Sequence, residues 1–279
     1  MNAIEIRQLQ KSYPGFALGP LDLRLPQGCI MGLIGENGAG KTTTIRLILD
    51  MLQRDGGSIR LLGRGDGEDV MLTREETGVV LDEVGFPECF NTRQVNNVMR
   101  LTYKNWDEAA YREYLRRFDL PEGKQFKDFS RGMKMKLGIV VALSHKPRLL
   151  ILDEPTSGLD PVVRDEVVEL FSEFTRDESH SILISSHIVS DLEKLCDYIA
   201  FLHKGQLLLC EEKDLLLSEY CILRCTAAEL DALPKAAVKG RKENPYGVTA
   251  IVRRDAAPVG ANISPISIEE LFVFMVKEA

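Results

Sequence analysis

The sequence predicts an α/β fold with an N-terminal antiparallel β region, a helical insert and a small C-terminal α+β extension. Three observations predict it. Residues 3–13 and 21–25 alternate apolar and polar side chains, as half-buried antiparallel strands do. The apolar runs at 29–34, 149–152 and 181–185 have the length and continuity of buried strands. Helix-like segments stand between these runs, which is the alternation of an α/β protein.

A glycine-rich loop joins the first buried strand to a helix. The loop spans residues 35–40, and residues 42–53 carry apolar side chains at helical spacing. Strand, glycine-rich loop and helix in that order form a phosphate-binding arrangement.

The helical insert is expected at about residues 90–145, with a break at 120–123. Beyond the strand that follows it, a helix is expected to begin at Asp160, because this N-cap residue precedes a proline at the first helical position. Residues 188–197 then predict a helix, and residues 198–209 predict a hairpin.

The composition shifts near residue 215, so we expect a first domain of residues 1–215 and an extension of residues 216–279. In the extension, residues 220–225 and 247–253 are strand-like, with a loop expected at 239–245.

The last helix is predicted to begin with a capping box at Ser267. An apolar stripe follows at helical spacing and must be buried, either within the chain or in self-association. It consists of Ile268, Leu271, Phe272 and Met275.

Composition limits the classes of protein that fit. The 279 residues include 44% hydrophobic and 28% charged residues, which is typical of a globular protein. The net charge of −7 supplies no basic field, so we expect no nucleic acid partner. Six scattered cysteines indicate free thiols in a reducing cytosol. Because we find neither a secretory signal nor a long apolar run, we expect a cytoplasmic chain that contacts a membrane only through a partner.

Residues 35–42 read Gly-Glu-Asn-Gly-Ala-Gly-Lys-Thr, which fits the P-loop pattern. Its glycines let backbone N–H groups turn toward the β- and γ-phosphates of a nucleotide. Lys41 adds a point charge, and the hydroxyl of Thr42 is a candidate Mg²⁺ ligand.

Two more strand ends carry polar side chains. Asp153 is placed to hold Mg²⁺ through water, and Glu154 to polarise an attacking water as general base. His187 follows the strand 181–185, which should lie beside the other two, so we expect it to sense the γ-phosphate. We expect the other three histidines, at positions 145, 180 and 203, to be surface or core residues.

The segment Phe129-Ser130-Arg131-Gly132-Met133-Lys134 precedes another helix-like run. Ser130 is a good N-cap, and the helix end that it opens could bind an anion.

In this order, the motifs resemble those of the ATP-binding subunits of ABC transporters. That family has a P-loop, a signature helix, a carboxylate strand running into Pro155-Thr156-Ser157-Gly158-Leu159-Asp160-Pro161, and a switch histidine. The match covers residues 3 to about 215. The resemblance implies ATP hydrolysis, with Lys41, Glu154 and His187 as the catalytic residues.

The resemblance also implies further roles. Tyr13 would stack on adenine, Asp160 would belong to the loop that communicates between two nucleotide sites, and Ser130 and Gly132 would contact ATP held by a second chain. The expected ATP-binding residues are Tyr13, Gly35, Glu36, Asn37, Gly38, Ala39, Gly40, Lys41, Thr42, Thr43, Ser130 and Gly132.

Two positions depart from the family pattern. The usual signature, leucine-serine-glycine-glycine-glutamine, is here Phe129-Ser130-Arg131-Gly132-Met133. Asp82 stands where the family has a glutamine that reaches Mg²⁺, and a carboxylate can ligate this ion but cannot donate an amide hydrogen bond. The Ser-x-Gly-Met-Lys form and the tail are similar to those of bacterial antibiotic and drug exporters.

We therefore expect an ATPase that uses ATP and Mg²⁺ and drives transport, in the direction of export. Two chains, as a homodimer or heterodimer, would clamp two ATP molecules. Integral membrane permease subunits would hold the pair at the inner face of the cell membrane. The alternatives are an ABC ATPase acting on ribosomes or DNA, and a module that binds ATP without turnover. The single P-loop and the short spacing from Lys41 to Ser130 disfavour the first, and the presence of Glu154 with His187 disfavours the second.

Overall fold

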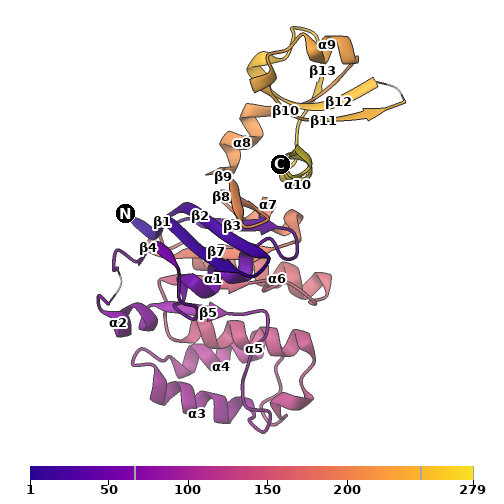
Figure 1. The fold of residues 1–279 in the computed structure, drawn as a ribbon. Coiled ribbons are helices and arrows are strands. Elements are labelled where there is room, and N and C mark those ends of the chain that lie inside the picture. Colours follow the sequence, from indigo (N-terminus) through magenta and orange to yellow (C-terminus); the bar gives the residue numbers. More distant parts are fainter. Residues whose placement is uncertain (66, 246, 279) are drawn as a thin grey trace.

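The computed structural model describes residues 1–65, 67–245 and 247–278 and confirms the α/β architecture. A helical insert lies at one end of the molecule, a central sheet lies in the middle, and the C-terminal extension lies at the other end (Figure 1).

The central sheet has six strands in the order β5-β6-β7-β3-β8-β9. The first five are parallel, and β9 pairs with β8 in the antiparallel sense. Every residue of β3, β6 and β7 is buried, which explains their unbroken apolar sequences. The strands are β3 (Ile30–Gly35), β5 (Thr77–Val80), β6 (Leu149–Asp153), β7 (Ser181–Ser186), β8 (Tyr198–His203) and β9 (Gln206–Glu212).

The register of this sheet brings three chain segments to one edge. Asp153 at the end of β6 pairs with Ser185 of β7, and Ile34 near the end of β3 pairs with Ser186. The residues that follow these three strands are therefore neighbours, as expected for parallel strands.

A second, antiparallel sheet has the order β2-β1-β4 and shares a core with α1 and one face of the central sheet. Its strands are β1 (Asn2–Tyr13), β2 (Phe16–Pro26) and β4 (Gly56–Leu61). The helix α1 spans Lys41–Ile48, so it ends earlier than residue 53, where its pattern was expected to stop. Asp50, with φ of +55°, interrupts the helical backbone just beyond it.

The helical insert contains α3 (Thr92–Thr102), α4 (Glu108–Arg117) and the short turn η1 (Phe126–Asp128), and α2 (Val70–Glu75) precedes it. A capping box between Asn91 and Gln94 starts α3. The hydroxyl of the buried Tyr111 donates to the Thr92 carbonyl at 2.8 Å and joins α4 to α3. The helices α5 (Arg131–Ser144), α6 (Pro161–Phe174) and α7 (Val189–Leu195) complete the layers.

The extension is a four-stranded sheet in the order β11-β12-β10-β13, with helices around it. The prediction of a loop at 239–245 is wrong, because most of that segment forms the edge strand β11. Charged side chains on an edge strand face solvent and hide the alternating pattern that would reveal a strand. The elements are α8 (Lys213–Glu219), β10 (Tyr220–Cys225), α9 (Ala227–Asp231), η2 (Lys235–Ala237), β11 (Val238–Asn244), β12 (Gly247–Arg253), η3 (Arg254–Ala256), β13 (Asn262–Ser264) and α10 (Ile268–Glu278). The domain boundary expected at 215 lies within α8.

The apolar stripe of α10 packs within the chain. Ile268 and Leu271 are fully buried in the main core, and the Phe272 ring lies 5.1 Å from that of Phe201 in β8. The predicted capping box is present, since Ser267 Oγ accepts from the Glu270 N–H at 3.2 Å and the Glu270 carboxylate accepts from the Ser267 N–H at 3.0 Å. Of the two expected outcomes for this stripe, burial within the chain or in self-association, the structure shows burial within the chain.

The cysteines and the helix lengths bear on the expected class of the chain. All six cysteines are free, and burial raises the pKa of the Cys196 thiol. Among the described residues, no helix combines the length and the apolar composition needed to cross a bilayer.

Candidate functional site

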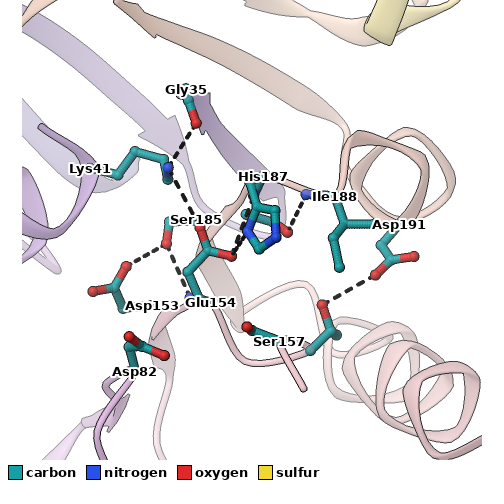
Figure 2. A network of polar contacts seen from close by, with 12 residues as sticks. Gly35, Lys41, Asp82, Asp153, Glu154, Ser157, Ser185, His187, Ile188 and Asp191 are labelled. Carbon is teal, nitrogen blue, oxygen red and sulfur yellow. Dashed lines mark hydrogen bonds and ion pairs between the residues drawn. The ribbon is translucent and has the colours of Figure 1, made fainter. Parts of the chain in front are cut away.

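The glycine-rich loop between β3 and α1 holds Lys41 against its own carbonyl groups. Gly40 has φ of +109°, a backbone conformation that favours glycine, and a Cβ there would also come within 2.7 Å of Leu18 Cδ1. The side chain of Lys41 is buried, and its Nζ donates to the carbonyl oxygens of Gly35 at 2.7 Å and Glu36 at 3.3 Å. The ammonium is therefore fixed in the loop, as Figure 2 shows.

Asp153 lies at the end of β6 and is almost fully buried. Its Oδ1 accepts from the hydroxyl of Ser185 at 2.5 Å, while Oδ2 has no hydrogen-bond partner among the described residues. A buried carboxylate oxygen without a donor is costly unless a ligand or water satisfies it. Oδ2 therefore marks a position where a cation or an ordered water fits.

Glu154 follows directly and has an unusual backbone. Its φ is +53°, a left-handed conformation that costs a non-glycine residue free energy. The Glu154 N–H donates to the Ser185 carbonyl at 3.2 Å and to the Ser185 hydroxyl at 3.1 Å, which holds this conformation. The strained turn directs the carboxylate into the cavity instead of along the strand.

The carboxylate of Glu154 lies between two basic groups (Figure 2). Its Oε2 is 2.7 Å from His187 Nδ1 and accepts from the His187 N–H at 3.3 Å, while its Oε1 is 3.5 Å from Lys41 Nζ. Because an ionised carboxylate only accepts hydrogen bonds, Nδ1 of His187 carries the proton when Glu154 is ionised. Three residues predicted separately from the sequence are thus brought together.

A cavity of about 640 Å³ opens over this group. Residues expected at the nucleotide site line it: Glu36, Asn37, Gly38, Gly40, Lys41, Thr42, Thr43, Glu154, His187 and the candidate metal ligand Asp82. Three other residues on its wall were not predicted as site residues, although Arg131 was noted as a departure from a family pattern: Phe16, Arg131 and Ser157. Ser157 lies in the loop that follows Glu154, but the sequence contains no signal for the side chain's direction.

Tyr13 lies near the cavity without lining it. It pairs with Phe16 across the β1–β2 hairpin, and Phe16 is the aromatic residue on the cavity wall. Tyr13 is 39% exposed, and Lys11 Nζ lies 5.6 Å from its ring centroid. Either ring of this hairpin end offers a stacking surface, and the adenine contact of Tyr13 stays a prediction.

Ser130 and Asp160 act as helix caps. Ser130 Oγ accepts from the Met133 N–H at 3.2 Å, and Asp160 Oδ1 accepts from the Val163 N–H at 3.1 Å. Neither of them, nor Gly132, lines the cavity of its own chain. Their expected contacts with a second nucleotide site therefore stay predictions.

The residues expected to hold Mg²⁺ fit that ion in part. Thr42 lines the cavity, and the unpartnered Asp153 Oδ2 suits contact through water. The third candidate, Asp82, is engaged, because its Oδ1 forms a 2.7 Å ion pair with Arg131 Nη2. Within the described residues, no cluster of three or more His, Cys, Asp or Glu could hold a metal alone. Mg²⁺ in a nucleotide site takes ligands from phosphates and water, so such a cluster is not required.

The remaining histidines have separate settings. His145 is buried, stacks on Tyr103 at 4.0 Å, and donates from Nδ1 to the Glu75 carbonyl at 3.2 Å. Burial lowers the pKa of His145 to about 4. His203, also buried, lies with Nδ1 3.2 Å from the carboxylate of Glu36 in the glycine-rich loop.

Comparison with known proteins matches residues 18–157 to the family described as ABC transporter. The bacitracin transport ATP-binding protein BcrA of Enterococcus faecalis is 33% identical over 73% of this chain and 67% of its own length. The lantibiotic transport ATP-binding protein SrtF of Streptococcus pyogenes is 34% identical over 76% of this chain and 91% of its own.

A solved structure described as the ATP-binding subunit of an ABC transporter is similar with a TM-score of 0.68 and 28% identity. The similarity covers 76% of this chain and 90% of that one.

Proposed function

This chain belongs to the ABC transporter family as its ATP-hydrolysing subunit, and we propose that the cavity above Lys41, Glu154 and His187 is where it hydrolyses ATP. The observation that carries the proposal is the contact of the Glu154 carboxylate with both Lys41 and His187 at the ends of β3, β6 and β7. A base held beside a phosphate-binding ammonium is the arrangement that hydrolysis of a triphosphate requires.

In this proposal Glu154 accepts a proton from water as the water oxygen forms a bond to the γ-phosphorus. The bond from this phosphorus to the bridging oxygen breaks, and ADP leaves. His187 orients Glu154 through the 2.7 Å contact, and Lys41 stabilises the developing negative charge. Thr42 directly, and Asp153 through water, would hold a Mg²⁺ ion that supplies further charge stabilisation.

We further propose that each ATP is shared between two chains. Ser130 and Gly132 lie at the start of α5 and do not line their own cavity, so that end of the helix is free to meet a second chain. Replacement of Ser130 by arginine tests this. The folded variant should bind ATP normally and lose turnover. Loss of the helix cap should lower its free energy of unfolding by about 1 kcal/mol.

Light scattering provides the second half of that test. Glu154→Gln should form a dimer with ATP, and the double variant Ser130→Arg, Glu154→Gln should remain a single chain. If Ser130→Arg abolishes ATP binding by the single chain, Ser130 belongs to the same site as Lys41 and the shared site is wrong.

We propose that membrane permease subunits bind this chain and that the cargo is a peptide antibiotic moved outward. The names of BcrA and SrtF support the cargo class. Exposed apolar side chains support a partner surface. Met51, which is 55% exposed, and Val70 line one hollow of about 340 Å³, and Met71, next to Val70 in α2, is 77% exposed.

Complementation in cells tests both parts. Deletion of the gene should increase sensitivity to bacitracin or a lantibiotic, and the native gene should restore resistance. Glu154→Gln should not restore it. Met71→Glu should also fail, although its purified chain should hydrolyse ATP normally. Unchanged sensitivity on deletion contradicts the cargo class but leaves the ATPase proposal standing.

A further inference from the structure

We propose that Arg131 senses whether a nucleotide occupies the cavity of its own chain. When a triphosphate binds there, the guanidinium leaves Asp82 for the phosphates, and this exchange changes the conformation of the start of α5. The proposal rests on the proposed function, in which Ser130 and Gly132 beside it face the ATP of a second chain. Arg131 would then connect one nucleotide site to the surface that completes the other.

Arg131 contacts two loops around the cavity. Its Nη2 lies 2.7 Å from Asp82 Oδ1, in the loop after β5, and 3.5 Å from the hydroxyl of Ser157, in the loop after Glu154. Its aliphatic stem lies over Gly158, where an added Cβ would be 3.3 Å from Arg131 Cδ. One side chain of α5 therefore joins both loops that frame the site.

The start of α5 is a single hydrogen-bonded unit. Arg131 is the first residue of the helix, between Ser130 and Gly132. The Ser130 hydroxyl accepts from the Met133 N–H, and the Ser130 carbonyl accepts from the Lys134 N–H at 3.0 Å. A displacement of the Arg131 backbone must therefore move or loosen Ser130 and Gly132 with it.

The contact with Asp82 is weak enough to exchange. The side chains of Arg131 and Asp82 are 61% and 48% exposed, and ion pairs at such exposure contribute little. A guanidinium binds phosphate with the same fork geometry that it uses for carboxylate. Lys41 is buried and fixed by two carbonyl groups, so among the described residues that line the cavity Arg131 is the Lys or Arg with an exposed side chain.

Hydrogen–deuterium exchange of the amides of residues 130–134 tests this sensor. The protein is measured with and without saturating ATP, in EDTA, at a concentration where light scattering shows single chains. In the native chain, ATP should change the exchange rates by at least about threefold, because a contact at the helix start is broken and remade. Arg131→Gln should abolish this response, and Arg131→Lys should retain part of it.

Asp82→Asn gives the second, different signature. It releases Arg131 before any nucleotide binds, so the exchange rates without ATP should already be near those of the native chain with ATP. Arg93→Gln is the matched control, because it removes an exposed arginine–glutamate pair on α3 that lies outside the cavity. Its ATP response should equal that of the native chain.

Three results overturn the sensor: a full ATP response in Arg131→Gln, no change of the nucleotide-free rates in Asp82→Asn, or loss of ATP binding in Arg131→Gln. The last would place Arg131 in the main phosphate site. Because the exchange is measured on single chains, it decides this inference even if Glu154→Gln fails to dimerise with ATP, a failure that would count against the shared site alone.

Discussion

Replacement of Glu154 by glutamine tests the central chemical assignment. The side chain keeps its shape but loses its charge and one of its two acceptor oxygens. The remaining oxygen should stay with His187, whose Nδ1 is 2.7 Å away, and the new amide NH₂ should turn toward Lys41 at the 3.5 Å position. Lys41 keeps its hydrogen bonds to Gly35 and Glu36, so we expect the variant to fold and to bind ATP.

The expected loss of turnover follows from the role of Glu154 as general base. A general base contributes about 10²–10⁴-fold, which corresponds to about 2.7–5.4 kcal/mol of barrier. Steady-state phosphate release should therefore fall at least about 100-fold, while ATP affinity from equilibrium titration stays the same or improves. The matched control is Glu173→Gln, which removes the carboxylate paired with Arg117 on the surface, outside the cavity, and should leave turnover unchanged. Turnover of Glu154→Gln within about threefold of native would remove Glu154 from the mechanism.

Three further predictions concern the metal, the pH dependence and the extension. Asp82→Ala should alter the Mg²⁺ titration of hydrolysis more than the ATP affinity, and an unchanged titration would make Asp82 a loop residue without a metal role. The folded pKa of His145 is depressed to about 4 from its ordinary 6.5, so its contribution to stability is present above pH 6.5 and is lost as the pH falls toward 4. Between pH 7 and pH 5 this loss should be roughly 2 kcal/mol in urea unfolding, and His145→Gln should lose that part of the pH dependence; an equal slope in both proteins would contradict it. Leu271→Ala should cost about 2–5 kcal/mol of unfolding free energy, whereas Val273→Ala, at a 41% exposed position of the same helix, should cost at most about 0.5 kcal/mol; similar losses would mean that α10 is not packed as described.

The order of chemical motifs could be predicted from the sequence because each depends on local rules. Glycines around Lys41 are needed for a backbone that only glycine adopts, and a continuous apolar run before Asp153 is needed for a strand buried on both faces. The caps at Ser130 and Asp160 are equally local, since each side chain bonds a backbone N–H three residues later. Such features survive in a single sequence.

The strand β11 was missed for a physical reason. It is an edge strand whose charged side chains face solvent, so neither burial nor alternation marked it, and its partner β12 supplies the hydrogen bonds that make it a strand. Likewise, the pattern of α10 required burial and favoured packing within the chain but left self-association open, and the structure buries the stripe in the main core.

The sequence by itself determined the sheet-and-helix architecture, the glycine-rich loop, the two carboxylates and the histidine, because backbone conformation and burial leave local patterns. Only the tertiary structure decided which side chains meet. It decided that Phe16 lines the cavity wall and Tyr13 does not. It also decided the positive φ that turns Glu154 toward Lys41 and His187, and the pairing of Arg131 with Asp82. Arg131 and Asp82 lie 49 positions apart in the chain, and no local pattern specifies a contact that arises when two separate segments pack against the same sheet edge.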